Sequence, residues 1–318
     1  MSKPVVLLYE PIHPKALEVL KGEAEVRMAP SLEEAALLEQ VADVDGIIIR
    51  ANGKVSRRLM QAAPRLKVVA RHGVGVEAID RQAAAELGIT VVNTPSANDE
   101  SVAEQCVAFM IVLAKRILES DRAIRAGDWE ARYRLIGVEV QGKTLGLVGF
   151  GKIGQRVAAI CHHGLGMPVL YHDVVAYPDA ENALQARRVS LEELLRVSDF
   201  VSLHLPLVPA TRGLIDEAAL RRMKPTAFLI NTARGPVIDQ AALVQALQDK
   251  RIAGAGLDVY DPEPLPPDSP LLRLENVVLS PHMAAHTDEA LLRMAMVVTD
   301  VLAVIEGRSP ESPVAPPA

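Results

Sequence analysis

Three side chains that suit acid–base chemistry or anion binding follow three successive predicted strands in the second half of the chain. Arg234 ends "AFLINTAR", Glu263 lies in the turn after "AGAGLDV", and His282 ends "NVVLSPH". Parallel strands present their carboxyl ends at one edge of a sheet, so we expect these side chains to lie there together. Taken singly, each has a simpler interpretation: a capping charge, a solvated turn acid and a loop histidine.

The three residue types together suit one reaction. The planar fork of an Arg grips a carboxylate and a neighbouring oxygen. A His titrates near neutral pH and exchanges a proton with an alcohol or a ketone, and a Glu bonded to its other ring nitrogen favours the imidazolium. The set predicts oxidation of a hydroxyl group beside a carboxylate, or the reverse reduction.

A glycine pattern lies upstream of these strands. Gly149, Gly151 and Gly154 form G-x-G-x-x-G between a predicted strand and a predicted helix. The first allows a tight turn, the second admits a pyrophosphate and the third lets the helix pack on the strand. The next predicted strand ends at Asp173, about 20 residues on, where a carboxylate accepts the ribose hydroxyls of NAD and repels a 2′-phosphate. No Arg follows immediately, so the pattern favours NAD over NADP; the alternative is an ordinary tight turn with a capping acid.

These groups are expected to be positioned by two α/β units. Runs of β-branched residues alternate with helical patterns in both halves of the chain, and this alternation predicts an α/β unit in each. The strands expected in the first half are residues 5–9, 46–50, 66–71 and 89–93. Those expected in the second half are residues 144–149, 168–172, 199–203, 226–231, 253–258 and 276–280. One long helix is expected near 100–120 and another over 287–307, and the Pro-rich residues 308–318 are predicted to be disordered.

Composition argues against several kinds of partner. The net charge is −6 with scattered Lys and Arg, so nucleic acid is not an expected partner. No basic-then-apolar leader and no bilayer-length apolar run occurs, so we expect no membrane association and a cytoplasmic location. Cys106 and Cys161 lie in apolar helical patterns and predict no disulfide. His162 and His163 are adjacent and face apart on a helix, so no metal site is expected.

Five stretches occur in a familiar order: "GLVGFGKIG", "VSLHLPLVPATRGLID", "MKPTAFLINTARGPVID", "GAGLDVYDPEPL" and "LSPHMAAHT". With them the chain resembles the D-isomer-specific 2-hydroxyacid dehydrogenases, the family of phosphoglycerate, glycerate and D-lactate dehydrogenases. The resemblance implies an NAD-dependent oxidoreductase that transfers a hydride at C2 of a 2-hydroxy or 2-keto acid. It implies that Arg234, Glu263 and His282 are the catalytic Arg, Glu and His.

The resemblance also implies the fold, two doubly wound parallel-sheet α/β domains. A Rossmann NAD-binding domain of residues 101–285 would be inserted into a flavodoxin-like substrate domain of residues 1–100 and 286–318. The motif and the resemblance together give the candidate cofactor-binding residues: Gly149, Gly151, Lys152, Ile153, Gly154, Asp173, Leu205, Pro206, Thr211, Thr232, Ala233, Asp258 and Ala284.

The substrate is less well defined. The loop "VARHGVGVEAID" resembles the family loop whose backbone N–H groups, here near Val74 and Gly75, bind the substrate carboxylate. Arg50 and Arg71 follow predicted strands, and arginines near these positions help phosphoglycerate dehydrogenases bind phosphate; the alternative is that both are solvated. D-3-phosphoglycerate dehydrogenase and glyoxylate or hydroxypyruvate reductase therefore both stay open.

Two further expectations concern function and assembly. NAD(H)-sensing transcriptional corepressors share this fold and the Arg-Glu-His set, so a non-enzymatic binding protein is an alternative; the negative net charge argues against it. The resemblance implies a homodimer formed through the long helix and residues 127–137.

Overall fold

The computed structural model describes residues 3–317 of the chain. Residues 1–2, at the start of the expected range 1–100, lie outside the described residues, and so does residue 318, at the end of the expected tail 308–318. The chain divides into two compact units: unit 1 is formed by Met1–Asn98 with His286–Ala318, and unit 2 by Asp99–Ala285. Between residues 3 and 317, no helix combines the length and the apolar character needed to cross a lipid bilayer.

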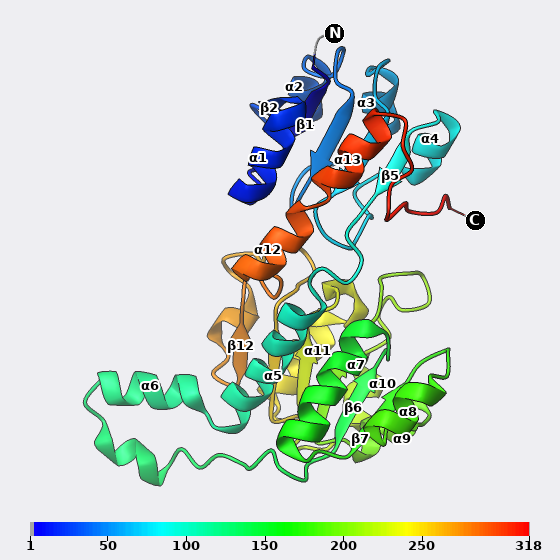
Figure 1. Ribbon diagram of the computed structural model, residues 1–318. Coiled ribbons are helices and arrows are strands. Elements are labelled where there is room, and N and C mark those ends of the chain that lie inside the picture. Colours follow the sequence, from blue (N-terminus) through cyan, green and yellow to red (C-terminus); the bar gives the residue numbers. More distant parts are fainter. Residues whose placement is uncertain (1–2, 318) are drawn as a thin grey trace. The chain divides into compact units, whose positions relative to one another are not determined.

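Unit 1 is built on a five-stranded parallel sheet in the order β2-β1-β3-β4-β5 (Figure 1). This order is the flavodoxin-like one. The strands are β1 (Val5–Leu8), β2 (Glu25–Met28), β3 (Gly46–Ile49), β4 (Val68–Arg71) and β5 (Thr90–Val92). The helices are α1 (Pro14–Glu23), α2 (Glu34–Leu38), α3 (Arg57–Gln61), α4 (Arg81–Glu86), α12 (Asp288–Ala295) and α13 (Val298–Ile305).

Both faces of this sheet are covered. Val5 and Leu7 of β1 pack in one apolar cluster with α2, α3 and α4, whereas Val6 and Leu8 pack in another with α1 and α13. Successive side chains of a strand point to opposite faces, so a doubly covered sheet needs apolar residues at every position. This is why "VVLL" and "GIII" are continuous apolar runs.

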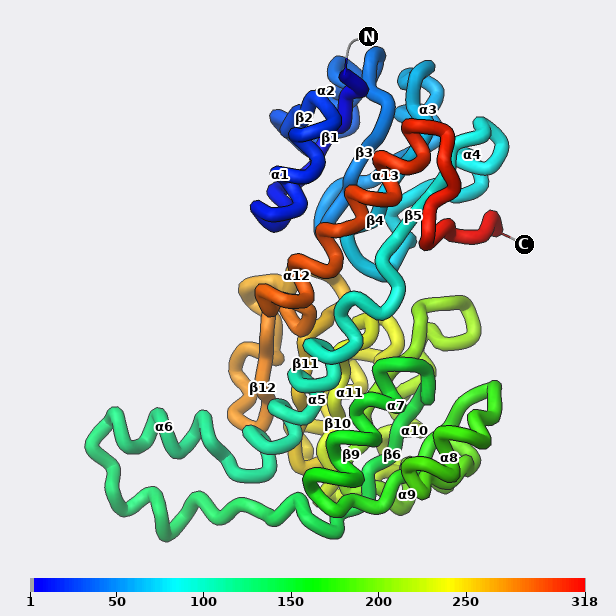
Figure 2. The backbone as a smooth tube through the Cα atoms, in the orientation of Figure 1, coloured from blue at the N-terminus to red at the C-terminus, as the bar shows by residue number. Residues whose placement is uncertain are grey.

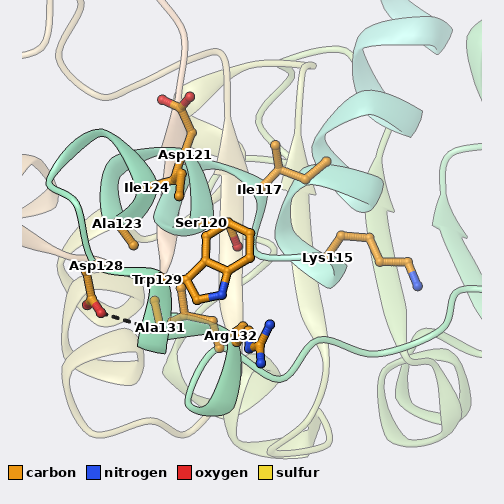
Figure 3. A pocket seen from close by; sticks show the side chains of 11 residues that line it. Lys115, Ile117, Ser120, Asp121, Ala123, Ile124, Asp128, Trp129, Ala131 and Arg132 are labelled. Atoms are coloured by element: carbon orange, nitrogen blue, oxygen red, sulfur yellow. Dashed lines mark hydrogen bonds between the residues drawn. The ribbon is translucent and has the colours of Figure 1, made fainter.

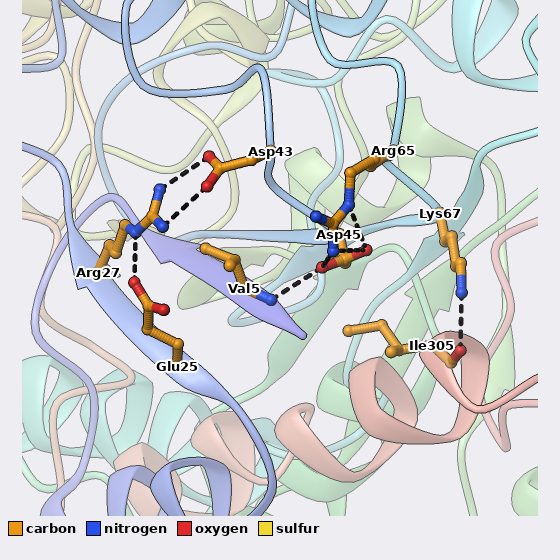
Figure 4. Close-up of polar contacts among 8 residues, drawn as sticks. All are labelled: Val5, Glu25, Arg27, Asp43, Asp45, Arg65, Lys67 and Ile305. Atoms are coloured by element: carbon orange, nitrogen blue, oxygen red, sulfur yellow. Dashed lines mark hydrogen bonds and ion pairs between the residues drawn. The ribbon is translucent and has the colours of Figure 1, made fainter. Parts of the chain in front are cut away.

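Hydrogen bonds of charged side chains hold the start of β1 and the edge strand β2 (Figure 4). The Asp45 carboxylate, on a residue only 5% exposed, accepts a hydrogen bond from the Val5 N–H at 2.8 Å and from the Arg65 guanidinium at 2.7 Å. On the edge strand β2, Arg27 forms a two-bond pair with Asp43 at 2.7 and 2.9 Å. Asp45 therefore stabilises the start of β1 from inside the fold, since a buried carboxylate needs such partners.

The tail differs from the prediction of disorder. Asp300 on α13, which is 6% exposed, accepts hydrogen bonds from the N–H groups of Glu311 at 2.7 Å and Ser312 at 3.0 Å. Pro313 then forms an antiparallel bridge with Val92 of β5. A buried carboxylate and an unpaired sheet edge therefore hold a Pro-rich segment in place, which composition alone does not reveal.

Unit 2 is built on a seven-stranded parallel sheet in the order β12-β11-β10-β9-β6-β7-β8 (Figures 1 and 2). The strands are β6 (Leu145–Val148), β7 (Val169–His172), β8 (Arg187–Arg188), β9 (Phe200–Leu203), β10 (Phe228–Asn231), β11 (Gly254–Leu257) and β12 (Val277–Leu279). Counted from β6 this is the Rossmann order 3-2-1-4-5-6 with a seventh strand added, and the order reverses between β6 and β9.

Helices cover this sheet too, and one packs very close to it. The longer helices are α5 (Asp99–Ala114), α6 (Ile117–Arg125), α7 (Lys152–Ala159), α8 (Pro178–Leu184), α9 (Leu191–Val197), α10 (Glu217–Arg222) and α11 (Gln240–Gln248). The shorter ones are η1 (Trp129–Tyr133), η2 (Ile160–Gly164), η3 (Gly235–Val237) and η4 (Pro270–Arg273). A Cβ on Gly256 of β11 would lie 2.8 Å from the Phe109 side chain, so "GAGL" leaves the room that α5 occupies.

The two long helices expected from the sequence are each broken. Arg116 adopts a left-handed conformation (φ 54°) between α5 and α6, which interrupts the helical hydrogen bonds. The pattern over 287–307 forms α12 and α13, with Met296 and Val297 between them. After the first break, α6 and the following segment reach away from the sheet of unit 2 before the chain enters β6 (Figure 2).

Candidate active site

The candidate cofactor and catalytic residues all lie in unit 2, in the loops after β6, β7, β9, β10, β11 and β12. Because the sheet is parallel, these loops meet at its carboxyl edge. The switch point between β6 and β9 lies within this edge, with the glycine loop after β6 and "HLPL" after β9. The topology therefore brings the sequence motifs together on one side of the sheet.

The glycine loop has the shape that its pattern predicts. Gly149 has φ 94°, and a Cβ there would lie 2.4 Å from the His204 carbonyl oxygen; a Cβ on Gly154 would lie 2.6 Å from the Gly149 carbonyl oxygen. A Cβ on Gly151 meets no atom within 4 Å. The outer two glycines are thus required by close packing, and the middle one faces open space at the start of α7.

This open space fits a phosphate group. Gly151 is the N-cap of α7 and no side-chain hydrogen bond caps that helix. Lys152 and Ile153 begin α7, and the first turn of a helix binds anions well.

Asp173 is fixed beside the glycine loop at the end of β7. Its carboxylate accepts the Phe150 N–H at 2.7 Å and the Val175 N–H at 3.0 Å, and its carbonyl accepts Arg188 at 2.8 Å. A carboxylate has about four acceptor positions, so capacity is left for two ribose hydroxyls. The phosphate cradle and this acid fit a dinucleotide. The contact with Arg188 was not predicted from the sequence, because this residue comes from the next strand, β8.

The other cofactor candidates line the same edge. Thr211 closes the loop after β9, since its hydroxyl donates to the Pro206 carbonyl at 2.6 Å and accepts the Val208 N–H at 2.9 Å. The Leu205 side chain lies next to Gly149, 3.1 Å from where a Cβ would be. Thr232 lies 3.0 Å from the buried Cys106 sulfur, and Ala233 follows it.

Glu263 and His282 form a hydrogen-bonded pair. Glu263 Oε2 lies 2.9 Å from His282 Nδ1, and Glu263 Oε1 accepts the Tyr260 N–H at 2.9 Å. Burial alone would raise the pKa of Glu263, but the hydrogen bonds from His282 and Tyr260 and the nearby Arg234 charge lower it below its usual value. Nδ1 is therefore held by a carboxylate, and Nε2 is the ring nitrogen left to meet a substrate.

Arg234 is placed by the residues on either side of it. The Asn231 side chain, 1% exposed, donates to the Arg234 carbonyl at 3.0 Å and accepts the Ala233 N–H at 3.0 Å. A Cβ on Gly235 would lie 1.8 Å from the Tyr260 carbonyl oxygen, so the loop after β10 packs directly against the loop after β11. Only glycine allows that approach.

Asp258 holds the loop that carries His282 through hydrogen bonds to the residues around it. Its carboxylate, on a residue 1% exposed, accepts hydrogen bonds from the Ser280 hydroxyl at 2.5 Å and from the N–H groups of Met283 at 2.8 Å and Ala284 at 2.9 Å. The His282 N–H donates to the Asp258 carbonyl at 2.8 Å, which supports its left-handed backbone (φ 51°). Asp258 and Ala284 were predicted as cofactor residues, and these contacts give Asp258 a positioning role.

The substrate candidates lie in unit 1. Arg50 and Arg71 lie at the carboxyl ends of β3 and β4, and Arg50 donates to the Pro11 carbonyl at 2.8 Å. Gly73 pairs with Thr94, and the Asn93 side chain donates to the Val74 carbonyl at 2.8 Å. These bonds fix the loop and use neither the Val74 N–H nor the Gly75 N–H.

His72 lies next to this loop and is 4% exposed. Burial, followed by the charge of Arg50, lowers its pKa to about 4. His72 is therefore neutral near pH 7, which fits a buried structural role better than that of a charged anion ligand.

Comparisons with known proteins show the family of this chain. The sequence model of the D-isomer specific 2-hydroxyacid dehydrogenase NAD-binding domain matches residues 107–284. Glyoxylate reductase of Korarchaeum cryptofilum is 45% identical over 86% of this chain and 83% of its own length. D-3-phosphoglycerate dehydrogenase of Archaeoglobus fulgidus is 39% identical over 93% of this chain, which spans 56% of that protein. The crystal structure of the TT0316 protein from Thermus thermophilus superimposes with a TM-score of 0.92 at 42% identity, covering 98% of this chain and 100% of that one. The chain therefore belongs to the D-isomer specific 2-hydroxyacid dehydrogenase family and is an NAD-dependent oxidoreductase.

Proposed function

We propose that His282 is the acid–base group of the reaction, that Glu263 orients it, and that Arg234 binds the substrate. The 2.9 Å hydrogen bond between His282 Nδ1 and Glu263 Oε2 carries this assignment, because it fixes the ring and leaves Nε2 to face the substrate. In reduction, Nε2 of the imidazolium donates its proton to the C2 oxygen of a 2-keto acid. In oxidation, neutral Nε2 takes the hydroxyl proton. Arg234 holds the C2 oxygen and the carboxylate in one plane.

The chemistry that a bound nicotinamide cofactor would supply is transfer of a hydride to or from C2. We assign the phosphates to the N–H groups after Gly151 and the adenosine ribose to Asp173. The remaining cofactor candidates, after β9, β10 and β12, follow the carboxyl edge of the sheet from there to His282. In unit 1, we assign the substrate carboxylate to the N–H groups of Val74 and Gly75.

For the substrate, we propose a small unphosphorylated 2-keto acid such as glyoxylate or hydroxypyruvate. The 45% identity with Korarchaeum glyoxylate reductase carries this choice, and the glyoxylate reductases of Aeropyrum pernix and Thermofilum pendens, at 40% and 41%, support it. The second candidate is 3-phosphohydroxypyruvate, because Arg50 and Arg71 place two cations at neighbouring strand ends.

An NADH-oxidation panel separates these candidates. Glyoxylate, hydroxypyruvate, pyruvate, longer 2-keto acids and 3-phosphohydroxypyruvate are compared by kcat/KM, with NADPH as the cofactor control. We expect glyoxylate or hydroxypyruvate to lead, and Arg50→Gln to leave that kcat/KM within about threefold. A lead for the phosphorylated acid, lost in Arg50→Gln, would assign a phosphoglycerate dehydrogenase. NADH binding without turnover of any acid would favour a sensor.

Two variants test the catalytic pair. We expect His282→Ala to lower kcat by about 10²–10⁴-fold while the Kd for NADH stays within about twofold. Glu263→Gln removes the carboxylate whose pKa the His282 hydrogen bond lowers, so the pH profile of reduction should change and kcat should fall. Loss of NADH binding in His282→Ala would make that residue structural, and an unmoved profile in Glu263→Gln would remove Glu263 from the mechanism.

We also propose a homodimer formed through α6, η1 and the segment after them. Exposed apolar side chains are concentrated there: Ile124 is 50% exposed, Trp129 62%, Tyr133 63% and Ile136 77%. A cavity of about 620 Å³ lies between α6 and η1. Figure 3 shows Trp129 and Arg132 among the side chains that line it. Such a patch on a projecting segment favours burial against a second copy.

Light scattering with size-exclusion chromatography tests the assembly. Wild type is expected to elute as a dimer and the Trp129→Ser/Ile136→Ser variant as a monomer. A monomeric wild type would refute the proposal.

We further propose that the enzyme works in the cytoplasm, in line with its two buried free cysteines.

A further inference from the structure

Tyr260 contacts all three loops that carry Arg234, Glu263 and His282. Its N–H donates to Glu263 Oε1 at 2.9 Å, and its hydroxyl lies 2.7 Å from the Ser280 carbonyl and 3.0 Å from the Leu257 carbonyl. A Cβ on Gly235 would lie only 1.8 Å from the Tyr260 carbonyl oxygen, so the loop that carries Arg234 packs directly against Tyr260. The side chain is 7% exposed and packs in the core of unit 2.

We propose that Tyr260 is a positioning residue for the reaction, whose hydroxyl fixes the end of β12, and with it His282, against the loop that carries Glu263. This inference rests on the proposed roles of Glu263 and His282. The ring of Tyr260 alone would fill its place in the apolar core. The hydroxyl is therefore not needed for core packing, and its role is to hold the turn before His282.

The turn that leads to His282 needs this support. The Ser280 carbonyl accepts both the Tyr260 hydroxyl and the His282 N–H, the latter at 3.0 Å. His282 itself has φ 51°, a region that costs energy for a residue with a side chain. Without the hydroxyl, the Ser280 carbonyl keeps only the His282 N–H as a partner, and the turn is held less firmly next to Glu263, although the contacts with Asp258 remain.

The tyrosine does not titrate in the working range. Burial, together with the charges of Asp258 and Glu263, raises its pKa to about 12, so the phenol remains a donor near neutral pH. A change in the pH profile of a Tyr260 variant therefore reports on the Glu263–His282 pair and not on the tyrosine.

Tyr260→Phe isolates the hydroxyl because it keeps the ring. We expect kcat for 2-keto acid reduction to fall by about 3- to 10-fold, the loss that corresponds to one hydrogen bond. The pH profile of reduction should change in the same sense as in Glu263→Gln, but less. The Kd for NADH should stay within about twofold, because the glycine loop and Asp173 are unchanged.

Asn276→Ala is the matched control for stability. Its side-chain amide donates to the Leu247 and Ala253 carbonyls, both at 3.3 Å, just before β12 and at the opposite end of that strand from His282. It should lower the melting temperature while leaving kcat and the pH profile as in wild type.

Two results would overturn the inference. One is a Tyr260→Phe enzyme with wild-type kcat and pH profile. The other is an Asn276→Ala enzyme whose kcat and profile change as in Tyr260→Phe at a similar melting temperature, since general loosening would then explain both. An active His282→Ala enzyme would instead refute the proposed function itself, so the two failures are distinguishable.

Discussion

Gly235→Ala is expected to damage catalysis far more than cofactor binding. The added Cβ would lie 1.8 Å from the Tyr260 carbonyl oxygen and 2.0 Å from its carbon, whereas ordinary contacts begin at 3.4 Å. Both neighbours are backbone, so neither can rotate away. The loops after β10 and β11 must therefore separate by about 1.5 Å, at a cost of about 1–3 kcal/mol in the free energy of unfolding.

This separation moves Arg234 relative to the Glu263–His282 pair. A misplacement of about 1 Å in a catalytic site lowers the rate by about 10²-fold, and we expect a loss of that order in kcat/KM for 2-keto acid reduction. The Kd for NADH, measured by cofactor fluorescence, should change by less than about threefold, because the glycine loop and Asp173, to which we assign the phosphates and the ribose, follow other strands, and only the candidates next to Gly235 and Tyr260 move. Unit 2 should melt about 3–9 °C lower.

Gly164→Ala is the control for this substitution. A Cβ at Gly164 meets no atom within 4 Å, and its φ is not in the left-handed region. It should leave kcat/KM, the Kd and the melting temperature within error of wild type. A Gly235→Ala enzyme with wild-type kcat/KM would refute the argument that this contact sets the position of Arg234.

Two further predictions concern unit 1. Because burial and then Arg50 lower the pKa of His72 from 6.5 to about 4, the unfolded chain takes up this proton first as the pH falls. Stability is complete above pH 6.5 and is lost toward pH 4, by up to about 3 kcal/mol. Urea unfolding at pH 7, 5 and 4 should show a shallower loss in His72→Gln but not in a variant of the exposed His163; equal slopes would contradict the assignment. Asp300→Ala removes the acceptor of two tail N–H groups. The Val314 amide, which is bonded to the Val91 carbonyl in the wild-type protein, should then exchange its hydrogen at least about tenfold faster. Unchanged exchange would show that the sheet edge alone holds the tail.

The sequence predicted the strands that are covered on both faces. Runs such as "GIII" are apolar at every position, and this pattern is distinctive in a parallel sheet. It did not predict β2 and β8, because "EVRM" and "RR" are short, charged edge strands without that pattern. The order of the tail was missed for a related reason, since the carboxylate that binds it lies on another element.

The sequence predicted those candidate site residues that follow directly after a recognisable strand. Arg234, Glu263 and His282 each follow an apolar run, and the glycine pattern is local in the chain. Tyr260 and Arg188 carried no such signal, because their importance arises from contacts between loops that only the fold brings together. Gly235 also carried no such signal, and only the structure shows that it makes room for the Tyr260 carbonyl.

The pairing of Glu263 with His282 does not require a ligand. Glu263 is held by the Tyr260 N–H, and the His282 turn is held by Asp258, so both partners are fixed from within unit 2. Groups that are ordered before substrate binds need no rearrangement during the reaction, and this lowers the barrier. Differences in substrate preference are then expected to arise at Arg50, Arg71 and the loop around Val74, which lie outside this framework. Changing the loop around Val74 should alter KM and the choice of acid, and Arg50→Gln should alter only the use of the phosphorylated acid, while the proposed Glu263–His282 pair, and with it the pH profile, stays the same.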